Sequence, residues 1–149
     1  PIPLPAISFG YTTAPFVRKA KAPMLLHEDP ATARQFTKGT FFSAWNKQAR
    51  FGGEVIGIGR IIKDPFKQSM SGMNETQYIY EGFQYLDEQY YDMTDTMPLK
   101  GVFTRWQNKD EILTVVPFEI VEVFPLMKEK YTTTDEIEKC IKALRKELG

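Results

Sequence analysis

Residues 39–66, GTFFSAWNKQARFGGEVIGIGRIIKDPF, contain two hydrophobic runs separated by a polar and basic segment. The first run ends at Trp45, and the second is rich in valine and isoleucine. Aromatic and β-branched residues favour strands, so the stretch predicts two strands joined by a hairpin loop. Gly57 and Gly59 fall on one face of the second strand by its two-residue period, and they leave room there for another backbone or a packed ring.

Outside this stretch the sequence predicts short helices and further strands in mixed order. Strands are expected at 23–27, 101–107 and 111–125, and short helices at 12–22 and 28–36. Asp29 is the expected N-cap of the second of these helices, because Pro30 follows it at the first helical position. Residues 67–75 predict a polar loop, whereas the aromatic and acidic residues 76–93 predict a helix or an irregular segment.

The last part of the chain carries two further signals. Pro117 lacks a backbone N–H and therefore predicts an edge or bulge position within the strand at 111–125. Residues 133–148 predict an amphipathic helix, because Thr133 and Glu136 match a capping box. The apolar stripe of this helix consists of Ile137, Ile141, Leu144 and Leu148. We expect this stripe to dock on the core.

The chain has 149 residues, which is enough to bury a core without disulfides or metal ions. We expect a single domain over 1–149, with residues 1–10 as an extended N-terminal arm and 133–148 as a C-terminal helix. The mixed order of strands and short helices predicts an α+β fold. Its architecture is expected to be a curved mixed sheet or a β-pseudo-barrel of about five strands, with short helices at its ends.

The formal net charge is zero, but the charges are uneven along the chain. Residues 1–63 hold nine Lys and Arg against three Asp and Glu, and residues 64–111 hold four against nine. A basic face is therefore compatible with a neutral protein. No run approaches the roughly 18 apolar residues of a membrane span. One cysteine, Cys140, and one histidine, His27, predict neither an internal disulfide nor a metal site, so we expect an intracellular protein without a cofactor.

A family resemblance appears in the central block FTKGTFFSAWNKQARFGGEVIGIGRIIKDPF, residues 36–66. A short helix, a glycine, a strand ending in an aromatic, a polar loop and a GxIxGxGxI-like strand resemble the PUA-like superfamily, with EVE, ASCH and YTH-type domains closest. YEGFQ at 80–84 is similar to the turn after the second strand of ASCH domains, and VVPFEIVEVF at 115–124 resembles their penultimate strand. The resemblance covers roughly residues 15–125 and implies a pseudo-barrel with a cleft for a nucleotide.

The resemblance implies that the protein binds nucleic acid or a nucleotide and reads a base, modified or unmodified, in an aromatic pocket. In such a site rings stack on the base, polar groups read its edge, and cations hold the flanking phosphates. Trp45 and Trp106 are the stacking candidates, and Ser43 and Asn46 are the edge-reading candidates. The candidate phosphate contacts are Lys47, Arg50, Arg18, Lys19 and Lys21. The alternative is that these residues have only structural roles: the tryptophans cover the core, and the cations are ordinary solvated residues.

Two other functions remain open on the sequence. Some ASCH domains are similar to amidohydrolases that deacylate a modified cytidine with a Lys, a Thr three residues later and a distant Glu. Here Lys21 and Glu81 match, but Met24 stands where the hydroxyl is needed, so catalysis is not expected. A protein-interaction module is the second alternative, because the tyrosine-rich acidic segment 76–93 suits an interface. His27 is expected to be a structural or rim residue.

Overall fold

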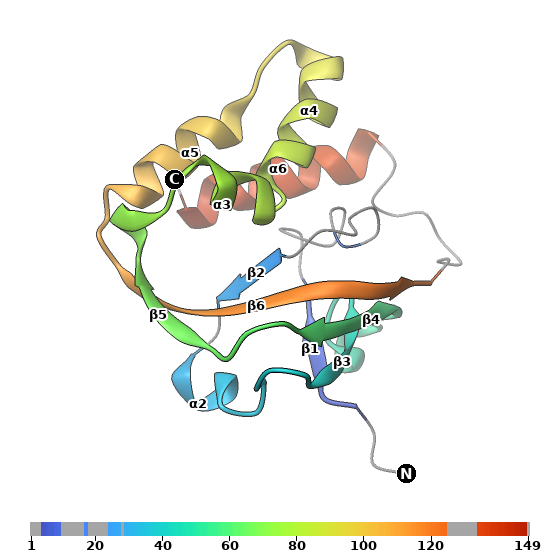
Figure 1. Ribbon diagram of the computed structural model, residues 1–149. Coiled ribbons are helices and arrows are strands. Elements are labelled where there is room, and N and C mark those ends of the chain that lie inside the picture. The colour runs from blue at the N-terminus through green and yellow to red at the C-terminus, as the bar shows by residue number, and fades with distance from the viewer. Residues whose placement is uncertain (1–3, 10–16, 18–23, 28, 125–133, 149) are drawn as a thin grey trace.

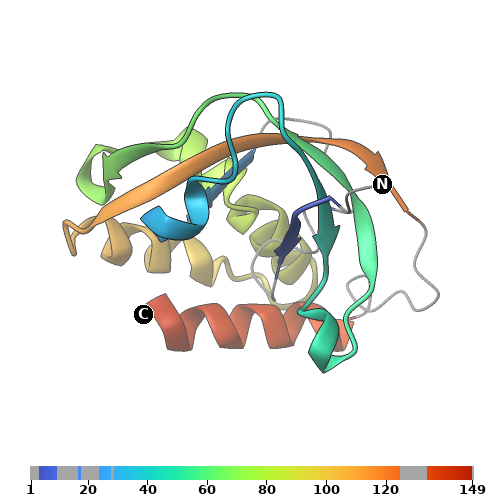
Figure 2. The same ribbon diagram turned by 90° about the horizontal axis from the view of Figure 1, so that it is seen from below.

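The computed structural model describes residues 4–9, 17, 24–27, 29–124 and 134–148. Six strands form a mixed sheet that curls into a half-barrel, and helices α3 to α6 lie together on one side of it (Figure 1; Figure 2 shows the arch of the sheet from below). The strands are β1 (Ala6–Ser8), β2 (Met24–His27), β3 (Phe41–Trp45), β4 (Val55–Ile61), β5 (Phe66–Ser69) and β6 (Ile112–Val123). The α-helices are α2 (Pro30–Ala33), α3 (Glu75–Tyr80), α4 (Phe83–Thr94), α5 (Pro98–Gln107) and α6 (Thr134–Leu148). Short 3-10 turns are η1 (Ala49–Phe51) and η2 (Met70–Gly72).

The sheet is built around β6. The strand order is β1-β3-β4-β6-β2, and β5 pairs with β6 beyond the end of β4. Only β1 and β3 run parallel among these pairs, and the others are antiparallel. The predicted fold class, an α+β fold with a curved mixed sheet and short helices, is confirmed.

The two glycines of β4 allow unusually close packing on either side of that strand. A Cβ atom at Gly59 would lie 2.1 Å from the ring of Phe42, its partner on β3, and one at Gly57 would lie 2.4 Å from the carbonyl oxygen of Glu122 on β6. Side chains at these positions would therefore collide with a ring and with a backbone. The expectation that the glycines make room for such groups is confirmed.

Pro117 lies in the interior of the central strand β6 rather than on an edge strand. Its register partner on β2 is Leu25. The Pro117 carbonyl accepts a hydrogen bond from the N–H of Ile62, so its missing N–H faces the same side, where β4 has just ended and β5 has not begun. The bulge of β6 lies elsewhere, at Val121, because Ile58 pairs with Glu122 while Gly59 pairs with Ile120. The edge-or-bulge prediction for Pro117 is wrong, since the break between β4 and β5 removes the need for its N–H.

Several other predicted elements match the structure. The Asp29 carboxylate accepts from the backbone N–H groups of Ala31 and Thr32, each at 3.0 Å, and thereby caps α2 as predicted. Strands at β2, β3, β4 and β6 occur where they were expected. Helix α6 buries Ile137, Ile141 and Leu144, as the apolar stripe predicted. Thr133 and the predicted helix at 12–22, apart from the buried Val17, lie outside the described residues.

Three element predictions are wrong or incomplete. Residues 101–107 form most of helix α5 instead of a strand, because Leu99, Val102, Phe103 and Trp106 have the helical i, i+3, i+4, i+7 spacing and all are buried. Residues 67–75 include strand β5 and the turn η2 instead of forming only a loop. The N-terminal arm contributes an edge strand, β1, and residues 76–93 belong to two helices, α3 and α4.

The helical layer is fixed by a buried carboxylate. Asp87 on α4 accepts hydrogen bonds from the Tyr78 hydroxyl at 2.5 Å and from the N–H groups of Leu99 and Lys100, each at 2.9 Å. These N–H groups open α5 and have no partner within their own helix, so Asp87 satisfies them and interacts favourably with the helix dipole. The carboxylate thus joins α3, α4 and α5. Burial, followed by the hydrogen bond to Asp87, raises the pKa of Tyr78 above its ordinary value of 10.0.

Replacement of Gly59 by alanine tests the close approach of the Phe42 ring. We expect Gly59→Ala to lower the free energy of unfolding by about 1–3 kcal/mol, because the ring or the strand must shift to admit the methyl group. Gly72→Ala is the matched control, since nothing lies within 4 Å of the added Cβ atom. Urea denaturation measures both. Equal stability of the two variants would contradict the packing described here.

The raised pKa of Tyr78 predicts a loss of stability in alkali. A phenol whose pKa is higher in the folded state keeps its proton longer there, so its contribution is complete below the unfolded pKa of about 10 and is lost as the pH rises above it. The free energy of unfolding of the wild type should fall more steeply above pH 10 than that of Tyr78→Phe. Denaturation at a series of alkaline pH values measures this difference, and parallel curves would count against the buried hydrogen bond.

Candidate functional site

The loop between β3 and β4 has a fixed backbone. The side chain of Asn46 is buried, with 1% of its surface exposed, and its carbonyl oxygen accepts a 2.8 Å hydrogen bond from the N–H of Glu54. The Asn46 N–H donates in turn to the carbonyl of Glu54 at 3.1 Å. This two-way bond closes the loop at its base. Asn46 therefore holds the hairpin together, and its buried amide cannot read a base edge at the surface.

Glycines shape the tip of the same loop. The N–H of Gly53 donates to the carbonyl of Gln48, and a Cβ atom at Gly53 would lie 1.9 Å from the Lys47 carbonyl oxygen. Gly52 ends the turn η1 with a φ of 77°, in the left-handed region that glycine adopts without strain. The loop is thus a compact turn, which gives its side chains defined directions.

Three side chains within five residues of this turn are exposed to solvent. Lys47 and Arg50 are exposed, and Phe51 has 62% of its surface exposed, which is unusual for a large aromatic residue. The Arg50 guanidinium carbon lies 4.7 Å from the centre of the Phe51 ring, in cation–π contact. Phe51 was not among the residues selected from the sequence. The signal that could have found it is an aromatic residue placed between a cation and two glycines in a loop.

Trp45 lies at the base of the hairpin on the outer face of the sheet. The alternation of β3 buries Phe42 and Ala44 and turns Ser43 and Trp45 outward, where Trp45 is half-buried. The indole N–H of Trp45 donates to the Ser43 hydroxyl at 3.1 Å, and this hydroxyl donates to the carbonyl of Pro5 at 3.4 Å. Ser43 therefore orients the indole ring instead of pointing freely into solvent.

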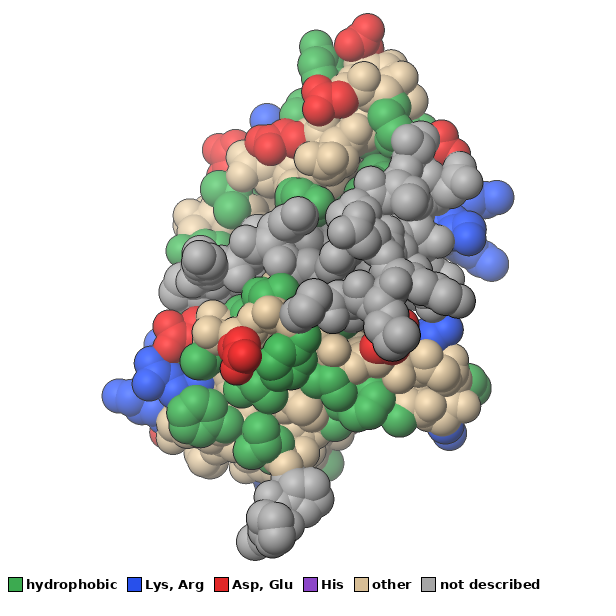
Figure 3. Space-filling view, turned by 90° about the vertical axis from the view of Figure 1, so that its right-hand side faces the viewer, with side chains coloured by type: hydrophobic (Ala, Val, Ile, Leu, Met, Phe, Trp, Pro, Cys, Tyr) green, Lys and Arg blue, Asp and Glu red, His purple; other side chains and the backbone are tan. Residues whose placement is uncertain are grey.

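The outer face around these strands is partly apolar. Figure 3 shows hydrophobic side chains gathered over the lower part of this face, where β1, β3 and β4 lie, with Lys and Arg side chains at its margins. Leu4, Phe41 and Val121 are exposed large apolar residues of this part of the chain. Arg60 pairs with Glu119 across β4 and β6. An aromatic and basic hairpin thus borders a sheet face that is neither fully polar nor covered by the described helices.

Trp106 is separated from this surface. It lies on α5 with only 7% of its surface exposed, and it packs against Phe83 and Phe103 at ring-centre distances of 6.3 Å each. The strand end predicted for it does not exist, because helix α5 turns the indole into the core. Trp106 is therefore not available to stack on a base beside Trp45. Arg18, Lys19 and Lys21 lie outside the described residues.

The residues considered for catalysis are not brought together in the part of the structure that is described. Glu81 is buried at the junction of α3 and α4. The backbones of Met24 and His27 lie at the two ends of β2, and Lys21 is not described. Cys140 is buried in α6. Across the described ranges, no group of three or more His, Cys, Asp or Glu side chains is arranged to hold a metal ion. None of the helices described here combines the length and apolar character needed to cross a membrane.

Comparison with known proteins does not assign this chain to a family. No family model matches the sequence, and no curated protein matches it. The crystal structure of a protein from Enterococcus faecalis V583, described by the family model DUF984, is similar with a TM-score of 0.46 and 14% sequence identity. The similarity covers 87% of this chain and 88% of that chain. A likeness at this level carries no inference about function.

The different surroundings of the two tryptophans predict their fluorescence behaviour. Iodide should quench the emission of Trp45 and leave that of the buried Trp106 nearly unchanged. Because Lys47 and Arg50 attract anions to the hairpin, iodide should quench Trp45 more strongly than caesium does. Quenching of the wild type, Trp45→Phe and Trp106→Phe separates the two signals. A quenchable emission that survives in Trp45→Phe would place Trp106 at the surface and contradict this arrangement.

Proposed function

We propose that this protein binds nucleic acid through the β3–β4 hairpin and reads a base, modified or unmodified, on the aromatic side chains beside it. The observation that carries the proposal is the joint exposure of Lys47, Arg50 and Phe51 on a turn whose backbone is fixed. Proteins that bind single strands combine cations along the backbone with aromatic rings on which bases stack. The hairpin offers both kinds of group within five residues.

The proposed roles follow from the chemistry of each side chain. Phe51 and the half-buried Trp45 present flat rings, which suit stacking on a base. Lys47 and Arg50 carry the charges that would neutralise phosphates, and Arg50 already lies over the Phe51 ring, where it would extend the stack. Ser43 acts through Trp45, because its hydroxyl accepts the indole N–H. The resemblance of this block to PUA-like domains supports the same assignment.

Fluorescence anisotropy with short single-stranded RNA and DNA tests the proposal. Phe51→Ala and Trp45→Ala should each weaken binding by roughly 5- to 150-fold, the equivalent of about 1–3 kcal/mol per stacked base. Arg50→Gln should also weaken binding, and it should reduce the slope of log affinity against log salt by about 0.7 for a single strand. Oligonucleotides that differ in one modified base test whether the stacked base is read.

Lys67→Gln on β5 is the matched control, because it removes one exposed charge far along the sheet from the hairpin (Figure 1). It should leave both affinity and salt slope close to those of the wild type. If Phe51→Ala and Arg50→Gln bind like the wild type while remaining folded, the hairpin is not the binding surface. A salt-independent affinity would exclude phosphate contacts altogether.

Protein binding is the second candidate, and the end of α4 favours it. Tyr91, Met93 and Met97 are exposed there, next to Asp92 and Asp95. Tyrosine and methionine are enriched at protein interfaces, and the carboxylates would repel nucleic acid. This candidate becomes the better one if the chain binds none of the oligonucleotides at low salt.

A further inference from the structure

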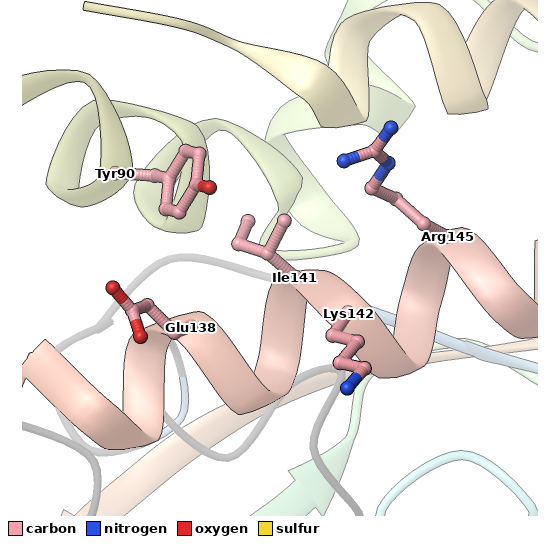
Figure 4. Close-up of a pocket in the computed structure, with 5 residues that line it drawn as sticks. All are labelled: Tyr90, Glu138, Ile141, Lys142 and Arg145. Carbon is pink, nitrogen blue, oxygen red and sulfur yellow. The ribbon is translucent and has the colours of Figure 1, made fainter. Parts of the chain in front are cut away.

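A second potential binding site lies between helices α4 and α6, away from the hairpin. It is a pocket of about 460 Å³, and the described residues that line it are Tyr90, Glu138, Ile141, Lys142 and Arg145. Figure 4 shows Tyr90 reaching in from α4 opposite Glu138, with the Ile141 side chain beside them and the Arg145 guanidinium farther along α6. The volume is within the range of about 300–1,000 Å³ that is typical of small-molecule sites.

The charged groups of this pocket do not neutralise one another. Within the described residues, Glu138 and Arg145 form no ion pair or hydrogen bond. In Figure 4 the Glu138 carboxylate lies on the side of Tyr90, the Arg145 guanidinium lies farther along α6 beyond Ile141, and the Lys142 ammonium group points away from Tyr90. The pocket therefore has a carboxylate at one end, a guanidinium at the other, and an apolar floor and a ring between them. The carboxylates of Glu88 and Asp92 on α4 do not line it.

The spacing of the two charged groups restricts the ligand. Glu138 and Arg145 are seven residues apart on one helix, so their backbones are separated by roughly 10 Å along its axis. The α-ammonium and α-carboxylate groups of a free amino acid are bonded to the same carbon atom, so these two groups are too close together to reach both. Inorganic phosphate would use Arg145 but not the ring of Tyr90. A nucleotide has the required length, with a flat base at one end and a phosphate at the other.

We propose that this pocket binds a nucleoside monophosphate whose base carries an amino group. The base packs against the exposed part of the Tyr90 ring, above the buried Ile141 side chain that forms the floor. Its amino group donates to the Glu138 carboxylate. The phosphate accepts paired hydrogen bonds from the Arg145 guanidinium, whose planar fork fits phosphate oxygens.

This site is independent of the proposed hairpin function, because it uses other elements and other residues. Either site can exist without the other. The pocket holds one free nucleotide, while the hairpin is open to a longer strand. The two proposals therefore fail separately, and the variants described below distinguish them.

Isothermal titration of the full chain with adenosine monophosphate tests the pocket, with adenosine, inorganic phosphate and inosine monophosphate as comparison probes. We expect saturable binding of adenosine monophosphate, and weaker binding of adenosine and of inorganic phosphate. Inosine monophosphate should also bind more weakly, since it presents a carbonyl to Glu138 in place of an amino group. Arg145→Gln should weaken the binding of adenosine monophosphate by roughly tenfold or more.

Two further variants sharpen the test. Glu138→Ala should remove the preference for adenosine over inosine monophosphate. Lys146→Gln is the matched control, because it removes an exposed positive charge next to Arg145 that does not line the pocket, and it should bind like the wild type. If Arg145→Gln does not fold, Arg145→Lys takes its place, with weaker binding expected because the lysine lacks the planar fork.

Three results would overturn the proposal. The first is the lack of saturable binding of adenosine monophosphate up to about 5 mM, a concentration that already corresponds to very weak affinity. The second is equal loss in Arg145→Gln and Lys146→Gln, which would indicate general attraction by the charge of α6. The third is loss of adenosine monophosphate binding in Phe51→Ala together with unchanged binding in Arg145→Gln, which would move the nucleotide to the hairpin.

Discussion

The close approach of the Phe42 ring to the bare backbone of Gly59 is the constraint on which the sheet depends. Because β4 carries no side chain at this point, the ring lies across the strand and meets Phe118 on β6 edge-on, with 5.4 Å between ring centres. Phe118 in turn packs against Phe9, and Phe42 against Phe36. One aromatic cluster therefore ties the segment after β1, strand β3 and the central strand β6 together, and it lines the inside of the curl.

The same constraint determines which side chains face solvent. With Phe42 directed inward, strict alternation along β3 directs Ser43 and Trp45 outward, and a slip of one residue would reverse both. The irregularity near the end of the pair, where Trp45 faces Val55 after Ala44 faces Gly57, sets where the hairpin begins. The buried Asn46 then closes the loop. The exposed positions of Lys47, Arg50 and Phe51 are thus consequences of packing on the opposite face of the sheet.

The sequence predicted those features that depend on local pattern. Alternation and β-branched residues located β3 and β4, the glycines of β4 indicated close packing, and Asp29 with Pro30 located α2.

The incorrect predictions have physical causes. Strand β5 is a short polar segment that is a strand only because it pairs with β6. Helix α5 was missed because the residues considered began at Gly101 and left out Leu99, without which the helical period is incomplete. For the same reason the sequence predicted that Trp106 lies at an exposed strand end, whereas helix α5 buries it. The pocket between α4 and α6 joins residues about fifty positions apart and has no local signal.

Charge that is uneven along the sequence becomes uneven in space through this topology. The basic first 63 residues supply β1, β3, β4 and the hairpin, and the acidic residues 64–111 supply the acidic helices α3 and α4. Helix α5 also comes from this segment, but it carries Lys100 and Arg105 and no acidic residue. A nucleic acid approaching the protein would therefore be attracted to the basic part of the sheet and repelled by the carboxylates of α4. In the second half of α6, Lys142, Arg145 and Lys146 add further positive charge to the helical layer, and Arg145 lines the pocket that α6 forms with α4. Arg145 and the ring of Tyr90 thus line the same pocket. The nucleotide proposed for this pocket would place its phosphate at Arg145 and its base at Tyr90.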